Sequence, residues 1–170
     1  MSYNATIRPI QPDEAAEAKA LVFQVAHELM EPETPFEDFK ALWNSWGVFN
    51  DMDSAPTSYF ENGGVFLVSV CDGRIVGTGA FLRYAAAGYC ELKRIALAPE
   101  HRGQGLGYAM IKELIGQAQT MGYRKMILWT NRFKLTRAVA LYRQIGFVEV
   151  SHAGADEDEI WMEMALAPED

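Results

Sequence analysis

The chain has 170 residues, of which 49% are hydrophobic, and its formal net charge is −8. This length and apolar content predict one folded domain over 1–170 and exclude a wholly disordered chain. The apolar runs fall short of the ~20 residues that a membrane-spanning helix needs, and the net negative charge argues against general nucleic-acid binding. Because the first residues also lack a signal-peptide pattern, we expect a cytoplasmic protein with no nucleic-acid and no membrane partner.

The hydrophobic periodicity predicts strands and helices in alternation. In chain order, we expect a strand at 3–10, helices at 13–30 and 35–46, a loop at 50–58, strands at 64–72, 74–84 and 88–99, a helix at 104–121, a strand at 125–130, a helix at 134–145, and closing strands at 147–152 and 159–166. The dipeptide Asp72-Gly73 predicts a tight hairpin, which argues against an all-parallel sheet. The sequence therefore predicts one mixed α/β domain.

The two cysteines, Cys71 and Cys90, lie in strand-like apolar runs. We expect both to be small buried hydrophobic side chains without a disulfide, as in a reduced compartment. No Cys/His cluster has the spacing of metal ligands, so we expect no metal.

The charges are distributed unevenly along the chain. Residues 91–147 hold ten Lys/Arg and three Asp/Glu, whereas 1–90 hold five and twelve, and 148–170 hold none and eight. Charge runs are usually solvated surface. The size of the contrast nevertheless favours a site for a polyanion in the basic centre.

Three glycines in five residues precede the helix expected at 104–121. Gly103, Gly105 and Gly107 would form a tight turn in which free backbone N–H groups and the positive end of the helix dipole can bind an anion. Arg102 adds a cation that suits phosphate. A P-loop is excluded because Tyr108 and Ala109 follow Gly107, and G-x-G-x-x-G fails from either starting glycine. The remaining pattern is R-x-x-G-x-G.

The segment "ELKRIALAPEHRGQGLGYAMIKELI" resembles the acetyl-CoA signature of the GNAT superfamily of N-acetyltransferases, and "AVALYRQIGF" resembles its second signature. This resemblance covers 88–150 and implies a GNAT-like mixed, mostly antiparallel sheet, splayed between the fourth and fifth strands and flanked by about four helices. It also implies that the pantetheine arm of acetyl-CoA lies in that gap, with the pyrophosphate on the glycine loop. The cofactor-binding residues are then Ile95, Ala96, Leu97, Arg102, Gly103, Gln104, Gly105, Leu106, Gly107 and Tyr108.

Asn131 is a further candidate for the cofactor, because Leu135 stands where many GNAT proteins have a cofactor-binding asparagine. Arg137 and Arg143 are weaker candidates for the 3′-phosphate.

The resemblance assigns catalytic roles to Glu91 as general base and to Tyr142 as general acid, with direct transfer to an amine in a ternary complex. Strict strand alternation puts Glu91 on one sheet face with Lys93, Ile95 and Leu97. The alternative for Glu91 is an ion pair with a nearby Arg or Lys, and for Tyr142 a place in the core. A backbone N–H at 95–97 would bind the oxyanion.

The acceptor is expected to be a small-molecule or peptide amine, and a homodimer stays open. Acidic residues of 28–38 stand near Phe36, Phe39, Trp43 and Trp46, which suits a cationic amine in a cleft or, alternatively, a solvated helix over its core. Two other functions stay open. One is a catalytically silent CoA-binding sensor or interaction module of the same fold, and the other is a nucleotide-binding enzyme.

Overall fold

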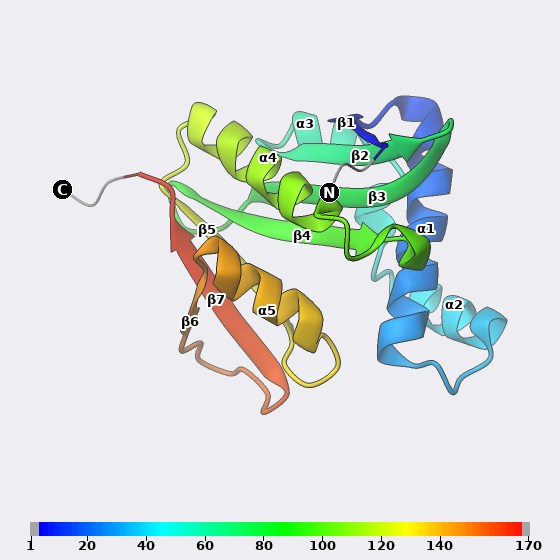
Figure 1. Ribbon diagram of the computed structural model, residues 1–170. Coiled ribbons are helices and arrows are strands. Elements are labelled where there is room, and N and C mark those ends of the chain that lie inside the picture. Colours follow the sequence, from blue (N-terminus) through cyan, green and yellow to red (C-terminus); the bar gives the residue numbers. More distant parts are fainter. Residues whose placement is uncertain (1–3, 168–170) are drawn as a thin grey trace.

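The computed structural model describes residues 4–167 and contains one seven-stranded sheet in the order β1-β2-β3-β4-β5-β7-β6 (Figure 1). Every neighbouring pair of strands is antiparallel except β4 and β5. The strands are β1 (Thr6–Pro9), β2 (Val65–Cys71), β3 (Arg74–Arg83), β4 (Tyr89–Leu97), β5 (Lys125–Asn131), β6 (Val148–Val150) and β7 (Glu159–Ala165). The predicted mixed, mostly antiparallel sheet is confirmed.

Helices accompany the sheet on both faces. They are α1 (Ala15–Met30), α2 (Phe36–Ser45), α3 (Thr57–Phe60), α4 (Leu106–Thr120) and α5 (Thr136–Ile145), with 3-10 turns η1 (Pro12–Glu14), η2 (Asn50–Met52) and η3 (Pro99–His101). The four long helices were all predicted. The loop predicted at 50–58 is corrected, because η2 and the start of α3 lie within it. None of the described helices has the length and apolarity needed to cross a bilayer.

The alternation of β2 divides the apolar core into two parts. Phe66 and Val68 pack with Phe23 of α1 and Phe39 of α2, whereas Val65 and Leu67 pack with the α4 residues Ile111 and Leu114 and with Phe81 of β3. All of these side chains are buried. Because β2 is covered on both faces, it reads in the sequence as the nearly continuous apolar run "VFLVSV".

The hairpin between β2 and β3 forms where it was predicted. Asp72 and Gly73 both have positive φ, 51° and 74°, as a two-residue turn of the primed type requires. The sheet therefore begins with antiparallel strands, as expected.

β4 and β5 separate soon after they pair. Their parallel pairing joins only Tyr89–Glu91 to Lys125–Ile127, although β4 continues to Leu97 and β5 to Asn131. The two strands diverge as they leave the paired end (Figure 1). The predicted splay between the fourth and fifth strands is confirmed, and beyond Glu91 the backbone of β4 pairs with no described strand on that side.

A β-bulge interrupts β4 within this splayed part. The register with β3 passes from Ala80↔Lys93 to Thr78↔Ala96, so β4 carries one residue more than β3 between these pairs. Arg94 has a positive φ of 57° in the bulge. The period of two is broken there, and the prediction that Glu91, Lys93, Ile95 and Leu97 share one face is wrong.

Candidate active site

A cavity of about 620 Å³ occupies the gap between β4 and β5. Its walls come from distant parts of the sequence: Glu91–Ala96 of β4, Leu128–Asn131 of β5, the inner side of α5, and apolar residues of α1. Glu91 and Tyr142, the two predicted catalytic residues, both line it. The fold thus brings them to one space from separate elements.

Glu91 stands at the point where the pairing of β4 with β5 ends. Among the described residues, none holds a cation within ion-pair distance of its carboxylate, so the alternative of an ion pair is not realised. Burial raises the pKa of Glu91; the charges of Lys93 and Arg94 lower it in part, and that of Asp51 raises it. A carboxylate in such surroundings is a stronger base than a solvated one.

Tyr142 reaches the cavity from α5 and is only 7% exposed. Its ring packs edge-on against Phe147, so the expected packing role is present as well. Its hydroxyl makes no hydrogen bond within residues 4–167, although it is not fully enclosed. Burial raises the pKa of Tyr142 above its ordinary value, so the hydroxyl keeps its proton at neutral pH.

The glycine turn precedes α4 as predicted. Gly103 and Gly105 have φ of 75° and 86°, and Gly105 is the N-cap of α4. A β-carbon at either position would enter open space, whereas one on Gly107 would meet Leu141 of α5 at 3.4 Å. The positive φ therefore favours glycine at 103 and 105, whereas Gly107 lies against α5.

Six consecutive backbone N–H groups at this turn are free. From Gly103 to Tyr108, no N–H donates a hydrogen bond to another described residue; the first internal bond runs from Ala109 N to the Gly105 carbonyl at 3.0 Å. Unpaired N–H groups and the helix dipole make this turn suited to an anion. The side chain of Leu106 is buried in the core, so only its backbone can take part.

Arg102 and Asn131 have partners that the sequence did not reveal. Arg102 donates one hydrogen bond to the Leu97 carbonyl at 3.0 Å and two to the Glu28 carboxylate at 2.8 and 3.0 Å. The Asn131 carboxamide oxygen accepts from two backbone N–H groups of the following turn, and its nitrogen donates to Asp158 at 3.1 Å. Their contacts with a cofactor stay predictions.

The bulge divides the predicted cofactor strand. Ile95 lies on the α4 side of the sheet, where it meets Met110 and Leu114 around Gly79. Glu91 instead feels the charge of Asp51 in η2. Ile95 and Ala96 line the cavity, but Leu97 does not. The stretch that was predicted to bind the cofactor therefore contains a break in the strand rather than a regular strand.

The expected acceptor cleft at α2 is only partly present. Of the four aromatic residues considered, Trp43 alone lines the cavity; Phe39 is fully buried, and Trp46 is 62% exposed outside it. The acidic side chains at the cavity come instead from β4, from the β6–β7 connection and from the start of β7, namely Glu91, Asp156, Asp158 and Glu159. The acidic run of 156–159 is visible in the sequence, but nothing in its pattern indicates that it reaches the cavity.

Comparisons with known proteins show the family to which the chain belongs. The profile of the Acetyltransferase (GNAT) family matches residues 23–147, so the chain belongs to the GNAT acetyltransferase family. An uncharacterized N-acetyltransferase of Schizosaccharomyces pombe is 38% identical over 59% of this chain and 61% of its own length. YjgM, an uncharacterized N-acetyltransferase of Escherichia coli, is 30% identical over 61% of this chain and 62% of its own length. The match thus spans about three fifths of these relatives.

Solved structures show the same fold over nearly the whole chain. A GNAT-family acetyltransferase of Staphylococcus aureus covers 96% of this chain and 99% of its own, with a TM-score of 0.79 and 16% identity. PaiA N-acetyltransferase of Thermoplasma acidophilum, solved with coenzyme A, covers 97% and 99%, with a TM-score of 0.76 and 16% identity. YncA of Salmonella typhimurium, a putative acetyltransferase solved with acetyl-CoA, covers 98% and 96%, with a TM-score of 0.66 and 17% identity.

Proposed function

We propose that this protein transfers the acetyl group of acetyl-CoA to a primary amine by direct attack in a ternary complex. The observation that carries the proposal is the presence of Glu91 and Tyr142 in one cavity, at the point where β4 and β5 separate. Membership of the GNAT family supports acyl transfer. The complexes of PaiA with coenzyme A and of YncA with acetyl-CoA support the choice of cosubstrate.

In this proposal the N-terminus of α4 binds the pyrophosphate of CoA. The free N–H groups from Gly103 to Tyr108 supply donors that need no rearrangement. The pantetheine arm then follows the part of β4 that β5 leaves unpaired, which places the thioester near the bulge. Backbone N–H groups at 95–97 would stabilise the developing oxyanion.

Glu91 would prepare the nucleophile. An alkyl amine has a pKa of about 10.4 and arrives as an ammonium ion, so a proton must leave before the nitrogen can attack. The carboxylate of Glu91 has a raised pKa and no competing cation partner among the described residues, and it can accept that proton directly or through one water. The neutral amine then attacks the thioester carbonyl carbon.

Tyr142 would complete the reaction. After the attack the nitrogen carries a positive charge and loses a second proton to solvent. When the tetrahedral intermediate collapses, the carbon–sulfur bond breaks, and the CoA sulfur leaves as a thiolate unless it receives a proton. The unbonded hydroxyl of Tyr142 is protonated at neutral pH and faces the same cavity. It is therefore the proton donor for the sulfur, and solvent returns its proton afterwards.

The test is thiol release from acetyl-CoA in the presence of a panel of amines, which includes diamines, amino acids, amino sugars and peptides. The proposal expects turnover with at least one primary amine and none with acetyl-CoA alone. A matched panel of alcohols is the control for nitrogen as the acceptor atom. Stabilisation of the fold by CoA without thiol release across the panel would instead indicate a silent CoA-binding module. Stronger stabilisation by ATP or NAD would indicate a nucleotide-binding enzyme.

A further inference from the structure

The bulge in β4 holds an arginine in a backbone conformation that arginine rarely adopts. Only Asp72 and Arg94 have positive φ among the non-glycine residues described, and Asp72 belongs to a hairpin turn that favours it. Arg94 lies inside a strand, beside the splay, where no turn requires the conformation. Other contacts must therefore hold it there.

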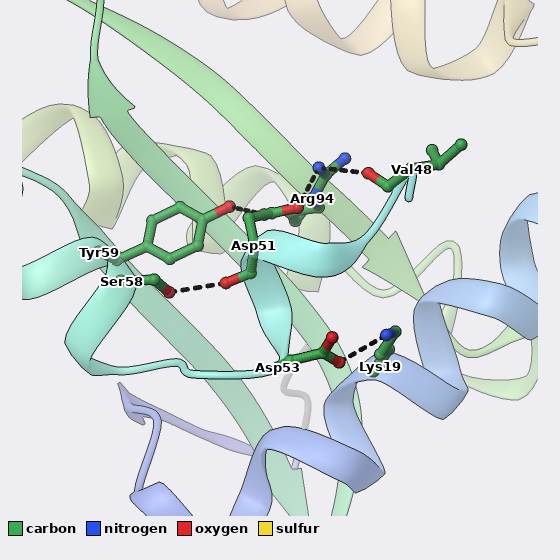
Figure 2. Close-up of polar contacts among 7 residues, drawn as sticks. All are labelled: Lys19, Val48, Asp51, Asp53, Ser58, Tyr59 and Arg94. Carbon is green, nitrogen blue, oxygen red and sulfur yellow. Dashed lines mark hydrogen bonds and ion pairs between the residues drawn. The ribbon is translucent and has the colours of Figure 1, made fainter. Parts of the chain in front are cut away.

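The side chain of Arg94 supplies these contacts (Figure 2). Its Nε donates to Asp51 Oδ2 at 3.0 Å, and one Nη donates both to Asp51 Oδ1 at 2.6 Å and to the Val48 carbonyl at 3.1 Å. Its guanidinium also lies over the ring of Phe49, 4.9 Å from the centroid. A planar group with a fixed fork of donors suits such a two-point contact.

Asp51 is itself held from the other side. The hydroxyl of Tyr59 donates to its carboxylate, and Ser58 Oγ donates to its backbone carbonyl at 2.6 Å (Figure 2). Tyr59 is fully buried in the core. The 48–59 segment therefore presents a rigid acceptor to the bulge rather than a mobile surface loop.

We propose that Asp51 and Arg94 form a positioning pair, which fixes the bulge of β4 and thereby sets both the backbone that receives the acetyl group and the charge balance around Glu91. Arg94 stands between Glu91 and the Ile95–Leu97 stretch, so its placement controls the spacing of the base and the oxyanion donors. The inference rests on the proposed function for its kinetic readout. Its structural readouts do not depend on turnover.

Asp51 also compensates the positive charge of Arg94 near Glu91. Other charged or titratable groups around the cavity are Lys93 on β4, Tyr142 on α5, Asp156 and Asp158 from the β6–β7 connection, and Glu159 at the start of β7. The residues of α1 that line the cavity are all apolar. The charge of Arg94 lowers the pKa of Glu91 and that of Asp51 raises it. Loss of the Asp51 charge alone would leave Arg94 uncompensated and would weaken the base.

The experiment compares Asp51→Asn with a matched control, Asp53→Asn. Asp53 lies two residues away in the same segment, but its carboxylate pairs with Lys19 of α1 at 2.5 Å and, within residues 4–167, forms no hydrogen bond or ion pair with β4 (Figure 2). For Asp51→Asn we expect the 13C-carboxyl titration of Glu91 to move to lower pH and the backbone amide resonances of Ile95 and Ala96 to shift. We also expect kcat to fall about tenfold to a hundredfold, while KM for acetyl-CoA stays within about twofold of the wild-type value. Asp53→Asn should change none of these.

An Asp51→Asn protein that is folded but has an unchanged Glu91 titration and unchanged kcat would overturn the inference. If that variant does not fold, Arg94→Lys provides the test, because it keeps the charge but loses the two-point contact. Its kcat should fall at least tenfold, and wild-type kcat would also overturn the inference. If the wild type acetylates no amine, the proposed function fails, and the titration and amide shifts still decide whether the pair positions the bulge.

Discussion

At the scale of single residues, one cavity holds two ionisable side chains that differ in protonation, the carboxyl of Glu91 and the phenol of Tyr142. The carboxyl of Glu91 is buried enough for its pKa to rise, yet no residue within 4–167 forms an ion pair with it, and the hydroxyl of Tyr142 keeps its proton. The surroundings of the two groups, and not their residue types alone, thus suit one to accept a proton and the other to donate a proton. Each can be removed by a substitution that preserves its shape.

Glu91→Gln should lower the rate of acetylation by about a hundredfold to ten-thousandfold near neutral pH. The loss should diminish as the pH approaches the pKa of the amine, because free amine then forms without a base. The measurement is kcat/KM against pH for both proteins. A variant with the wild-type profile would exclude Glu91 as the base.

Tyr142→Phe should reduce kcat by about a hundredfold, because the sulfur leaves without a proton donor. The edge-on contact with Phe147 does not need the hydroxyl, so the melting temperature and the affinity for CoA should stay close to those of the wild type. A thioester with a more acidic leaving thiol should recover part of the rate. Equal loss with both thioesters would contradict the role in thiol protonation.

At the scale of elements, the strand and helix pattern was readable because it is local. The alternating runs, the Asp72-Gly73 turn and the glycines before α4 each carry their own signal. The bulge at Arg94 was missed because one extra residue in "ELKRIAL" changes no pattern in the sequence. Its cause lies 43 residues earlier in the chain, at Asp51.

The partners of Arg102 were hidden for the same reason. A cation next to a glycine loop predicts a phosphate contact, yet Glu28, 74 residues away, forms a bidentate pair with it. Sequence spacing identifies groups that can act together within one element. It does not identify which distant element approaches them in the fold.

Gly105→Ala tests the turn before α4, and Gly122→Ala at the end of the same helix is its matched control. Both glycines have φ of 86° and open space at the β-carbon position, so each substitution should cost about 1 to 2 kcal/mol in stability. Only Gly105→Ala should weaken CoA binding, by about tenfold to a hundredfold, because its methyl group enters the space beside the free N–H groups. Calorimetric titration with CoA measures this difference, and equal affinities would contradict the loop assignment.

At the scale of the whole molecule, ion pairs join the acidic flanks to the basic centre. Five of the eight ion pairs among the described residues cross this division: Arg94–Asp51, Arg102–Glu28, Lys125–Glu163, Arg132–Glu149 and Arg143–Glu149. The uneven charge seen in the sequence therefore serves the fold as well as any ligand. It also ties the stability of the protein to pH.

The melting temperature should fall as the pH drops through the ordinary carboxyl range, and the raised pKa of Glu91 should lower it again toward neutral pH. Hydrogen bonds from arginine lower the pKa of Glu28 and Glu149. At Asp51 burial raises the pKa, but the hydrogen bonds from Arg94 and Tyr59 and the charges of Arg94 and Lys93 together lower it by more. The unfolded chain therefore binds protons more readily than the folded protein. The stability that these pairs contribute is present at pH values above the ordinary pKa, 4.5 for Glu and 3.8 for Asp, and is lost as the pH falls below these values.

Glu91 acts in the opposite direction. Its raised pKa means that the folded protein holds the proton longer than the unfolded chain does, so its contribution is fully present below 4.5 and is lost as the pH rises through its folded value. Glu91→Gln should therefore melt higher than the wild type at pH 7 and show the same decline below about pH 4.5. Melting curves from pH 3 to pH 8 measure both limbs. If Glu91→Gln gained nothing at pH 7, the carboxylate would not be a destabilising group retained for catalysis, and the assignment of the base would lose its energetic support.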